Sequence, residues 1–202
     1  MFKFLQQFLV ISLVVSLTAC GTTSGMKRGD ANQAGSKEEQ KAAIGASFAE
    51  FTRISVMDFN SELKAPPRNE AKRAVAESKT AAAGKRFADK IAAGLSGSGM
   101  FTEVVRNDAK PGDLIIKGEV TKYKEGNRAG RLLIGFGAGS ANFDATVRFV
   151  NGTTNEEISQ ISVDKNSWFL GGLLAAAQDV DDFIDGAAEK VAEETIKAKS
   201  GQ

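Results

Sequence analysis

The chain has 202 residues, enough for one domain with an export signal and a linker, and its 42% hydrophobic and 25% charged residues are typical of a packed globular protein. Twenty-six basic and 25 acidic side chains leave a net charge of +1 without a basic cluster, so we expect no nucleic-acid partner. The chain has no histidine and one cysteine, which removes the commonest general base, the usual zinc ligands and any internal disulfide; we expect no cofactor or metal.

The N-terminus has the layout of an export signal. Lys3 precedes an apolar run, Phe8 to Leu17, whose ten residues fit the core of a signal peptide. This run is too short for a membrane-spanning helix, which needs about 20 residues. The sequence Leu17-Thr-Ala-Cys20 then resembles the lipobox of bacterial lipoproteins. The resemblance implies cleavage before Cys20 and acylation of this cysteine, which would hold the mature protein on the lipid bilayer.

Three segments are predicted: a lipoprotein signal peptide over residues 1–19, the lipidated cysteine and a flexible tether over residues 20–47, and a single α+β periplasmic domain over residues 48–202. Residues 21–40 are rich in Gly, Ser, Thr, Asn, Gln and charge, a composition that cannot offset the entropy cost of ordering. Threonine rather than aspartate at position 22 favours the inner leaflet of the outer membrane, facing the periplasm.

The domain is predicted to begin with a strand and a long helix. Residues 51–59 are apolar on both faces, which is typical of a buried strand. Pro66-Pro67 and Asn69 mark a turn and a helix start. Residues 69–95 have the apolar spacing of an amphipathic helix, and the glycines and serines of residues 96–99 end it. The residues expected on its buried face are Ala74, Ala81, Gly84, Phe87 or Ala88, Ile91 and Leu95.

Four strands and a helix are predicted after it. Residues 101–105 and 113–123 form two strands around a turn at Pro111-Gly112, and residues 143–150 alternate between apolar and polar. Asn151-Gly152 predicts a hairpin, and a change of phase near Ser159 indicates a bulge in the returning strand, residues 156–166. With a last helix over residues 179–199, the pattern predicts an α+β two-layer sandwich, a mixed sheet of about five strands packed against two helices.

Two motifs suggest a ligand, but each fits a structural role better. The glycine-rich segment Gly135 to Gly139 has Ser140 in place of the third glycine of a dinucleotide fingerprint, and a strand follows it instead of a helix. Four carboxylates near the last helix lack EF-hand spacing and suit a helix N-terminus, with the first as the cap. They are Asp179, Asp181, Asp182 and Asp185.

The segment from Trp168 to Leu174 is apolar and contains two glycines. It packs into the core in one interpretation and forms a contact surface for a protein or the bilayer in the other. Trp168 and Phe169 are the candidate partner contacts, with Arg131 as a cationic neighbour beside the glycine-rich segment. We assign no catalytic residues, because the serines lack a suitable base and a nucleophile elbow is absent. Two carboxylates brought together by folding would be the remaining route to a hydrolase.

Several blocks together resemble an uncharacterised lipoprotein group, domain-of-unknown-function family 4410. They are Ile54-Ser-Val-Met-Asp-Phe59, the Gly-x-Phe-x-x-Val of residues 99–104, Leu114 to Val120, and Arg131-Leu-Leu-Ile-Gly135-Phe-Gly-Ala-Gly139, followed by a late helix. The family brings no catalytic residues. It implies a fold similar to that of periplasmic envelope-assembly lipoproteins, which is an analogy of fold and not of function.

The leading hypothesis is therefore a membrane-anchored, non-enzymatic periplasmic lipoprotein that binds an envelope protein. A small-ligand or glycan-binding lipoprotein that uses Arg131 and the glycine-rich segment is the alternative, and a carboxylate-dependent hydrolase is a third.

Overall fold

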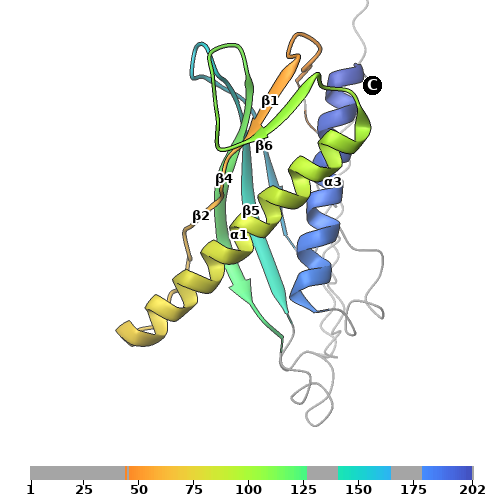
Figure 1. The fold of residues 1–202 in the computed structure, drawn as a ribbon. Helices are drawn as coiled ribbons and strands as arrows, with labels where there is room; N and C mark the ends of the chain where they lie inside the picture. The colour runs from red at the N-terminus through yellow and green to blue at the C-terminus, as the bar shows by residue number, and fades with distance from the viewer. Residues whose placement is uncertain (1–43, 45, 127–140, 165–178, 202) are drawn as a thin grey trace, which may run out of the picture. The chain divides into compact units, whose positions relative to one another are not determined.

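The computed structural model describes residues 44, 46–126, 141–164 and 179–201. All of them belong to one compact unit, Glu38–Gln202. The described residues form six strands and two helices, shown in Figure 1. In chain order these are β1 (Arg53–Val56), β2 (Asn60–Ser61), α1 (Glu70–Ser98), β3 (Glu103–Arg106), β4 (Leu114–Lys124), β5 (Asn142–Asn151), β6 (Glu157–Val163) and α3 (Val180–Ser200).

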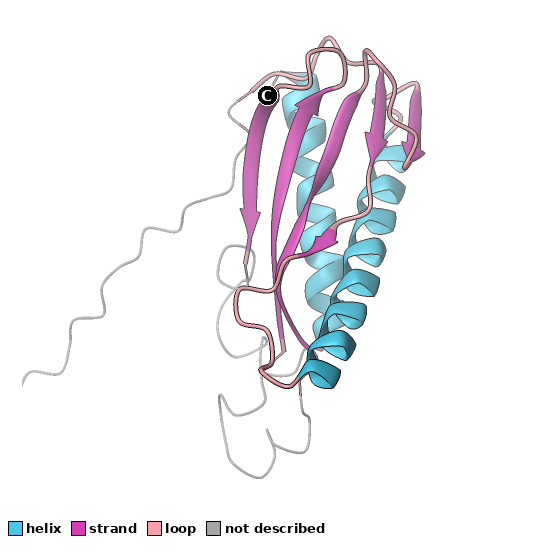
Figure 2. Ribbon diagram, turned by 90° about the vertical axis from the view of Figure 1, so that its left-hand side faces the viewer, coloured by secondary structure: helices cyan, strands magenta, loops and turns pink. Residues whose placement is uncertain are grey.

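The strands form one mixed sheet in the order β3-β1-β4-β5-β6, and the two-residue β2 also pairs with β4. β1 is parallel to both β3 and β4, and β2 is parallel to β4. β5 is antiparallel to β4 and β6. Both helices cover the same face of this sheet (Figure 2), so the predicted α+β two-layer sandwich is confirmed, with the short β2 in addition to the five expected strands.

The core lies between the helices and the covered face of the sheet. The alternation expected over residues 143–150 is confirmed, because Phe143, Ala145, Val147 and Phe149 are buried. The ring of Phe87 from α1 lies 5.1 Å from the Phe143 ring, measured between centroids, in an edge-on arrangement that aromatic pairs favour. The apolar alternation of β5 therefore decides which face of the sheet receives the helices.

Helix α1 begins where the sequence predicts and ends at Ser98, three residues beyond the predicted Leu95. The side chain of Asn69 accepts a hydrogen bond from the Lys72 amide, and Gly99 closes the helix in a left-handed conformation with φ of 66°. Its buried face, however, starts only at Thr80. The prediction that Ala74 and Ala81 are buried is wrong. The first turns of α1 extend past the edge of the sheet (Figure 1) and have no strand to pack against.

Helix α3 carries the predicted apolar stripe, from Val180 through Phe183 and Ile184 to Thr195. Asp179 forms a capping box with Asp182, so the expected cap is confirmed. Neither described helix combines the length and the apolar sequence needed to cross a membrane.

The β5–β6 hairpin and its bulge are also confirmed. Phe149 pairs with Ser159 and Val150 pairs with Glu157, so one extra residue, Ile158, lies in β6 next to the position where the phase changes. The turn is longer than the two-residue loop that Asn-Gly favours. The side chain of Asn151 accepts hydrogen bonds from the amides of Thr153 and Thr154, which stabilises this wider turn.

Candidate functional site

The residues predicted to carry function lie outside the described residues. These are Cys20, Arg131, Trp168 and Phe169, and the segment Gly135–Gly139 lies outside them as well. The structure does show where the chain leaves and re-enters the described elements on either side of residues 127–140 and 165–178. We therefore describe the residues that flank these two segments first.

The flanking residues lie together at one end of the sheet. Lys124 at the end of β4 pairs with Asn142 at the start of β5. Val163 at the end of β6 pairs with Ala145, three residues further along β5. Tyr123 lies near the start of α3: its pKa is raised to about 12, mainly by burial and further by the carboxylates of Glu125 and Asp181. Residues 127–140 and 165–178 are thus bordered at the same end of the domain.

The first described residues of the chain lie at the opposite end. The Phe48 amide donates to the carbonyl of Ala198, in the last turns of α3, over 2.9 Å. Lys199 Nζ donates to the carbonyls of Ala49 and Phe51, each at 2.8 Å. Because α3 has 21 residues and an α-helix rises about 1.5 Å per residue, the two ends are about 30 Å apart.

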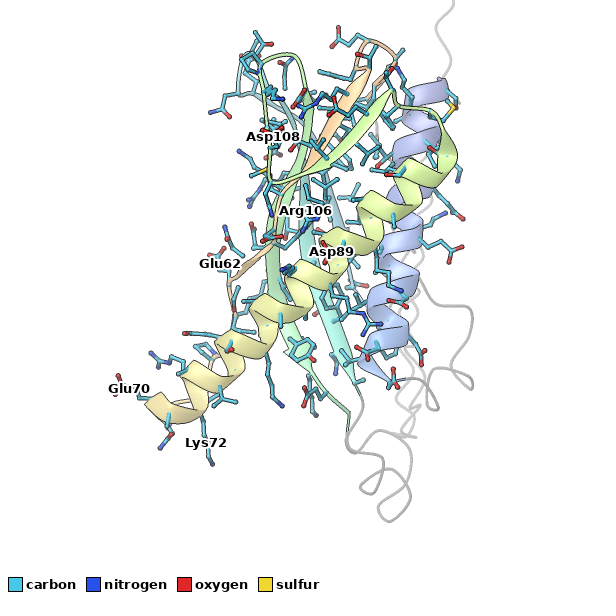
Figure 3. The ribbon with its side chains drawn as sticks, viewed as in Figure 1. Glu62, Glu70, Lys72, Asp89, Arg106 and Asp108 are labelled. Atoms are coloured by element: carbon cyan, nitrogen blue, oxygen red, sulfur yellow. The ribbon has the colours of Figure 1, made fainter. Side chains whose placement is uncertain are left out.

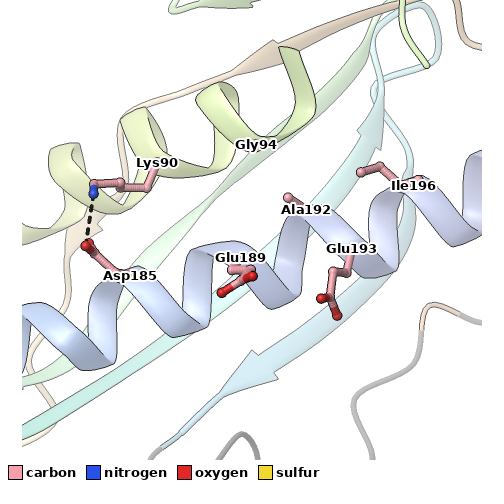
Figure 4. Close-up of a pocket in the computed structure, with 7 residues that line it drawn as sticks. All are labelled: Lys90, Gly94, Asp185, Glu189, Ala192, Glu193 and Ile196. Atoms are coloured by element: carbon pink, nitrogen blue, oxygen red, sulfur yellow. Dashed lines mark hydrogen bonds and ion pairs between the residues drawn. The ribbon is translucent and has the colours of Figure 1, made fainter. Parts of the chain in front are cut away.

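The second part of the site is a groove of about 300 Å³ between α1 and α3 (Figure 4). The two helices come close where Gly94 faces Ala192: a Cβ on Gly94 would lie only 3.0 Å from the Ala192 Cβ. The residues that line the groove are Lys90, Gly94, Asp185, Glu189, Ala192, Glu193 and Ile196. We call this feature the helix groove.

The ion pairs between the helices stop partway along the helix groove. Lys90 Nζ lies 2.9 Å from Asp185 Oδ2, and Arg86 pairs with both Asp181 and Asp185. The hydrogen bond to Asp181, opposed by desolvation, makes the largest contribution to raising the pKa of Arg86. One turn beyond Lys90, α1 has Gly94 and offers no cation to Glu189.

The carboxylates at the start of α3 form a helix cap and ion pairs. Asp179 and Asp182 form the capping box, whereas Asp181 and Asp185 face the basic residues of α1. Within the part of the chain that the structure describes, no cluster of acidic or other ligand side chains is arranged to hold a metal ion. The predicted cap at Asp179 and the acidic first turn with Asp181 and Asp182 are confirmed.

Two half-buried arginines form ion pairs along the sheet edge that carries β1 and β3. Arg53 pairs with Glu103, Asp108 and Asp113, and the Asp113 side chain is only 3% exposed. Arg106 pairs with Asp58 and, at 2.8 Å, with Asp89 on α1, as Figure 3 shows for Arg106 and Asp89. These arginines join segments that are far apart in sequence, so their role is structural.

The sequence gives one sign of the helix groove. Asp181, Asp185, Glu189 and Glu193 follow each other at intervals of four residues, so that they share one face of a helix. What they face depends on α1, which lies about 95 residues earlier in the chain, as in the Lys90–Asp185 pair. Spacing within one helix cannot show that partner, and sequence reasoning therefore missed the groove.

Comparison with known proteins gives a family but no activity. A family model described as a domain of unknown function, DUF4410, matches residues 54–171, more than half of the chain. The match begins in β1 and ends beyond β6, so that α3 lies outside it. The search of curated proteins gave no match.

Solved structures with a similar arrangement include two of the PelC dodecamer from Paraburkholderia phytofirmans. One has 12% identity and a TM-score of 0.40, covering 71% of this chain and 93% of that chain. The other has 11% identity and a TM-score of 0.41, covering 72% and 92%. Protein XCC0632 from Xanthomonas campestris, of family DUF330, has 10% identity and a TM-score of 0.45, covering 77% and 92%. These values are too low to support an argument about function or assembly.

Proposed function

The chain belongs to the DUF4410 family, a domain of unknown function, and we propose from its own sequence and geometry that it is a membrane-anchored periplasmic lipoprotein that binds an envelope protein. The lipobox-like sequence at Cys20 supplies the anchor. Residues Trp168 and Phe169, together with Arg131, supply the contact surface for the partner.

The main support for this proposal is the position of the two ends of the domain. The residues after the tether meet the C-terminal turns of α3, through the Phe48–Ala198 hydrogen bond. The residues that border 127–140 and 165–178 lie at the other end, about 30 Å away along α3. In this arrangement the tether joins one end of the domain, and the segments with the candidate contacts border the other end. The domain can therefore reach a partner away from its own membrane.

The described carboxyl groups with a clear pKa shift do not have the shift that a two-carboxylate hydrolase needs. A hydrolase that uses two carboxylates needs one with a raised pKa, to act as the general acid. Four described carboxyl groups have a lowered pKa: these are Asp58, Asp108, Glu125 and Glu194. Each belongs to an ion pair with an arginine or lysine, so their shifts reflect structural pairing.

Cross-linking in cells tests the proposal. The tagged full chain is cross-linked in its native envelope, and the proteins that co-purify are identified by mass spectrometry. We expect one or two envelope proteins in the parent sample and their loss from a Trp168→Ser, Phe169→Ser variant. The matched control is Met100→Ser, because Met100 is an exposed apolar residue (37%) just after the end of α1.

The thermal unfolding midpoint separates contact from stability. If the double variant keeps the parent midpoint and loses the partner, the two side chains form a contact surface. If it unfolds at a much lower temperature, they belong to the core and the assigned surface is wrong. A parent sample without a specific partner would overturn the protein-binding function itself.

A further inference from the structure

Two surfaces of the domain are mostly exposed among the described residues: the helix groove, whose Lys90 pairs with Asp185, and the start of α1, whose Lys79 pairs with Glu125 at 2.6 Å. We call residues 70–79 of α1 the α1 arm. All of them are exposed except the half-buried Ala76, and the first buried residue of the helix is Thr80. The α1 arm extends past the edge of the sheet (Figure 1), and its Glu70 and Lys72 lie far from the helix groove of the same molecule (Figure 3).

The α1 arm carries an apolar residue between basic ones on one face. Val75 is the most exposed large hydrophobic residue of the described chain, at 57%. Lys72 and Lys79 lie three and four residues from it, so the three side chains share one side of the helix. Ten helical residues without packing are marginally stable in water. A contact that buries Val75 would therefore stabilise the α1 arm.

The helix groove has the complementary surface. Its floor is apolar and shallow, formed by Gly94, Ala192 and Ile196. Its rim is acidic beyond the Lys90–Asp185 pair. Glu189 lies there, on the side of α1 where the residue one turn after Lys90 is the uncharged Gly94. Glu193 lies one turn further along the same rim. An apolar side chain flanked by lysines fits such a surface in both shape and charge.

We propose that the helix groove of one molecule binds the α1 arm of a second copy of this chain. Val75 lies on the floor at Gly94 and Ala192, and Lys72 pairs with Glu189. The contact uses two different surfaces, so the association is head-to-tail. It is self-association, and is separate from the envelope partner assigned above to Trp168 and Phe169.

Disulfide trapping between two purified full-length variants tests the pairing. The two variants are Val75→Cys and Glu193→Cys. Both residues are exposed, so neither substitution disturbs the core. Mixed under mild oxidation, the two variants should form a disulfide-linked dimer in larger yield than either alone. The matched control mixes Glu193→Cys with Met100→Cys, which offers an exposed cysteine elsewhere. The parent chain measures any background from Cys20, the one native cysteine.

Equal yields from the Val75→Cys and Met100→Cys mixtures would overturn the proposal, and so would the absence of the mixed dimer. A dominant Val75→Cys homodimer would show that two α1 arms meet each other, which also contradicts it.

A charge exchange measured by sedimentation provides an independent test. Lys72→Glu and Glu189→Lys should each weaken self-association of the full chain about tenfold, a change of about 1.4 kcal/mol in binding free energy. The combined variant should recover most of the loss, because the pair is restored with its charges exchanged. Losses that simply add would contradict the pairing. Because this test uses only the purified chain, its outcome is independent of any envelope partner.

Discussion

At the scale of single residues, two glycines allow the helix layer and the sheet to approach closely, because they have no Cβ atom. A Cβ on Gly118 of β4 would lie 1.9 Å from the Thr146 carbonyl oxygen and 2.9 Å from the Phe59 ring. A Cβ on Gly84 of α1 would lie 2.5 Å from the Phe59 carbonyl oxygen. Phe59 follows β1 and packs edge-on against Phe87, with ring centroids 4.9 Å apart. The close approach of α1 to the sheet therefore depends on a hydrogen at position 84.

We expect Gly84→Ala to destabilise the protein by about 1–3 kcal/mol, because the new methyl group meets backbone that cannot move aside easily. The matched control is Gly97→Ala in the same helix, where a Cβ would meet nothing within 4 Å. That control should stabilise the protein by about 0.5–1 kcal/mol, since alanine favours helix more than glycine does. Urea unfolding of the two variants measures both values. Similar changes in the two would show that Gly84 is not a packing constraint.

Glu194 gives a pH-dependent prediction. Its side chain is 7% exposed and lies 3.1 Å from Lys190 Nζ and 2.9 Å from Lys197 Nζ. Burial alone would raise its pKa, but hydrogen bonds and charge from the two lysines outweigh burial, so the pKa lies below the ordinary 4.5. The resulting stabilisation is fully present above the pKa of the unfolded chain and is lost as the pH falls through the lower folded value.

The parent chain should therefore lose stability more steeply than Glu194→Gln between about pH 5 and about pH 3. The measurement is the urea midpoint at several pH values in that range. Glu193→Gln, one residue away and exposed, is the control and should follow the parent. Parallel curves for the parent and Glu194→Gln would show that this carboxylate has the same pKa in the folded and unfolded chain.

At the scale of elements, the two helices differ in how much of their length is packed. α3 is buried from its first residue, Val180, whereas α1 is buried only from Thr80. Both begin with a side-chain cap, Asp179 and Asn69 respectively. The same kind of cap therefore stabilises a packed helix in one case and an exposed extension in the other.

Removing each cap should have different consequences. Asp179→Ala should lower the global free energy of unfolding by about 1 kcal/mol, because the first turn of α3 belongs to the core. Asn69→Ala should leave global unfolding nearly unchanged and speed amide hydrogen exchange over residues 70–79, which can fray without unfolding the domain. Equal losses in global stability would show that the start of α1 is packed as firmly as the start of α3.

At the scale of the whole molecule, the anchor is the feature most directly open to test. Cys20→Ala should block lipid addition and cleavage, because the thiol is the site of acylation in proteins with a lipobox. We expect a precursor larger than the mature protein on a denaturing gel, without incorporation of labelled palmitate. Ser24→Ala, a neighbouring substitution outside the lipobox-like sequence, should mature normally. A Cys20→Ala product of normal size that still incorporates palmitate would overturn the lipoprotein assignment.

The sequence determined most of the local structure, because local signals depend only on neighbouring residues. The period of two in residues 143–150, the Asn-Gly hairpin, the helix start at Asn69 and the cap at Asp179 each reflect a requirement of a few consecutive backbone groups. These predictions are confirmed, as is the layer arrangement that follows from the order of helices and strands. The lipobox-like sequence is equally local, and its function remains a prediction.

Only the tertiary structure decided which surfaces face each other. Ala74 and Ala81 follow the helical spacing of α1 yet are exposed: Ala74 precedes the packed part of the helix, and Ala81 lies on its exposed side, next to the buried Thr80. In the sequence Gly94 is only a glycine within a helix. In the fold it forms the floor of a groove, because it lies against Ala192 of a distant segment. Arg53 likewise finds Asp113 sixty residues away. Burial and pairing depend on long-range contacts, and the spacing of residues along one element does not contain them.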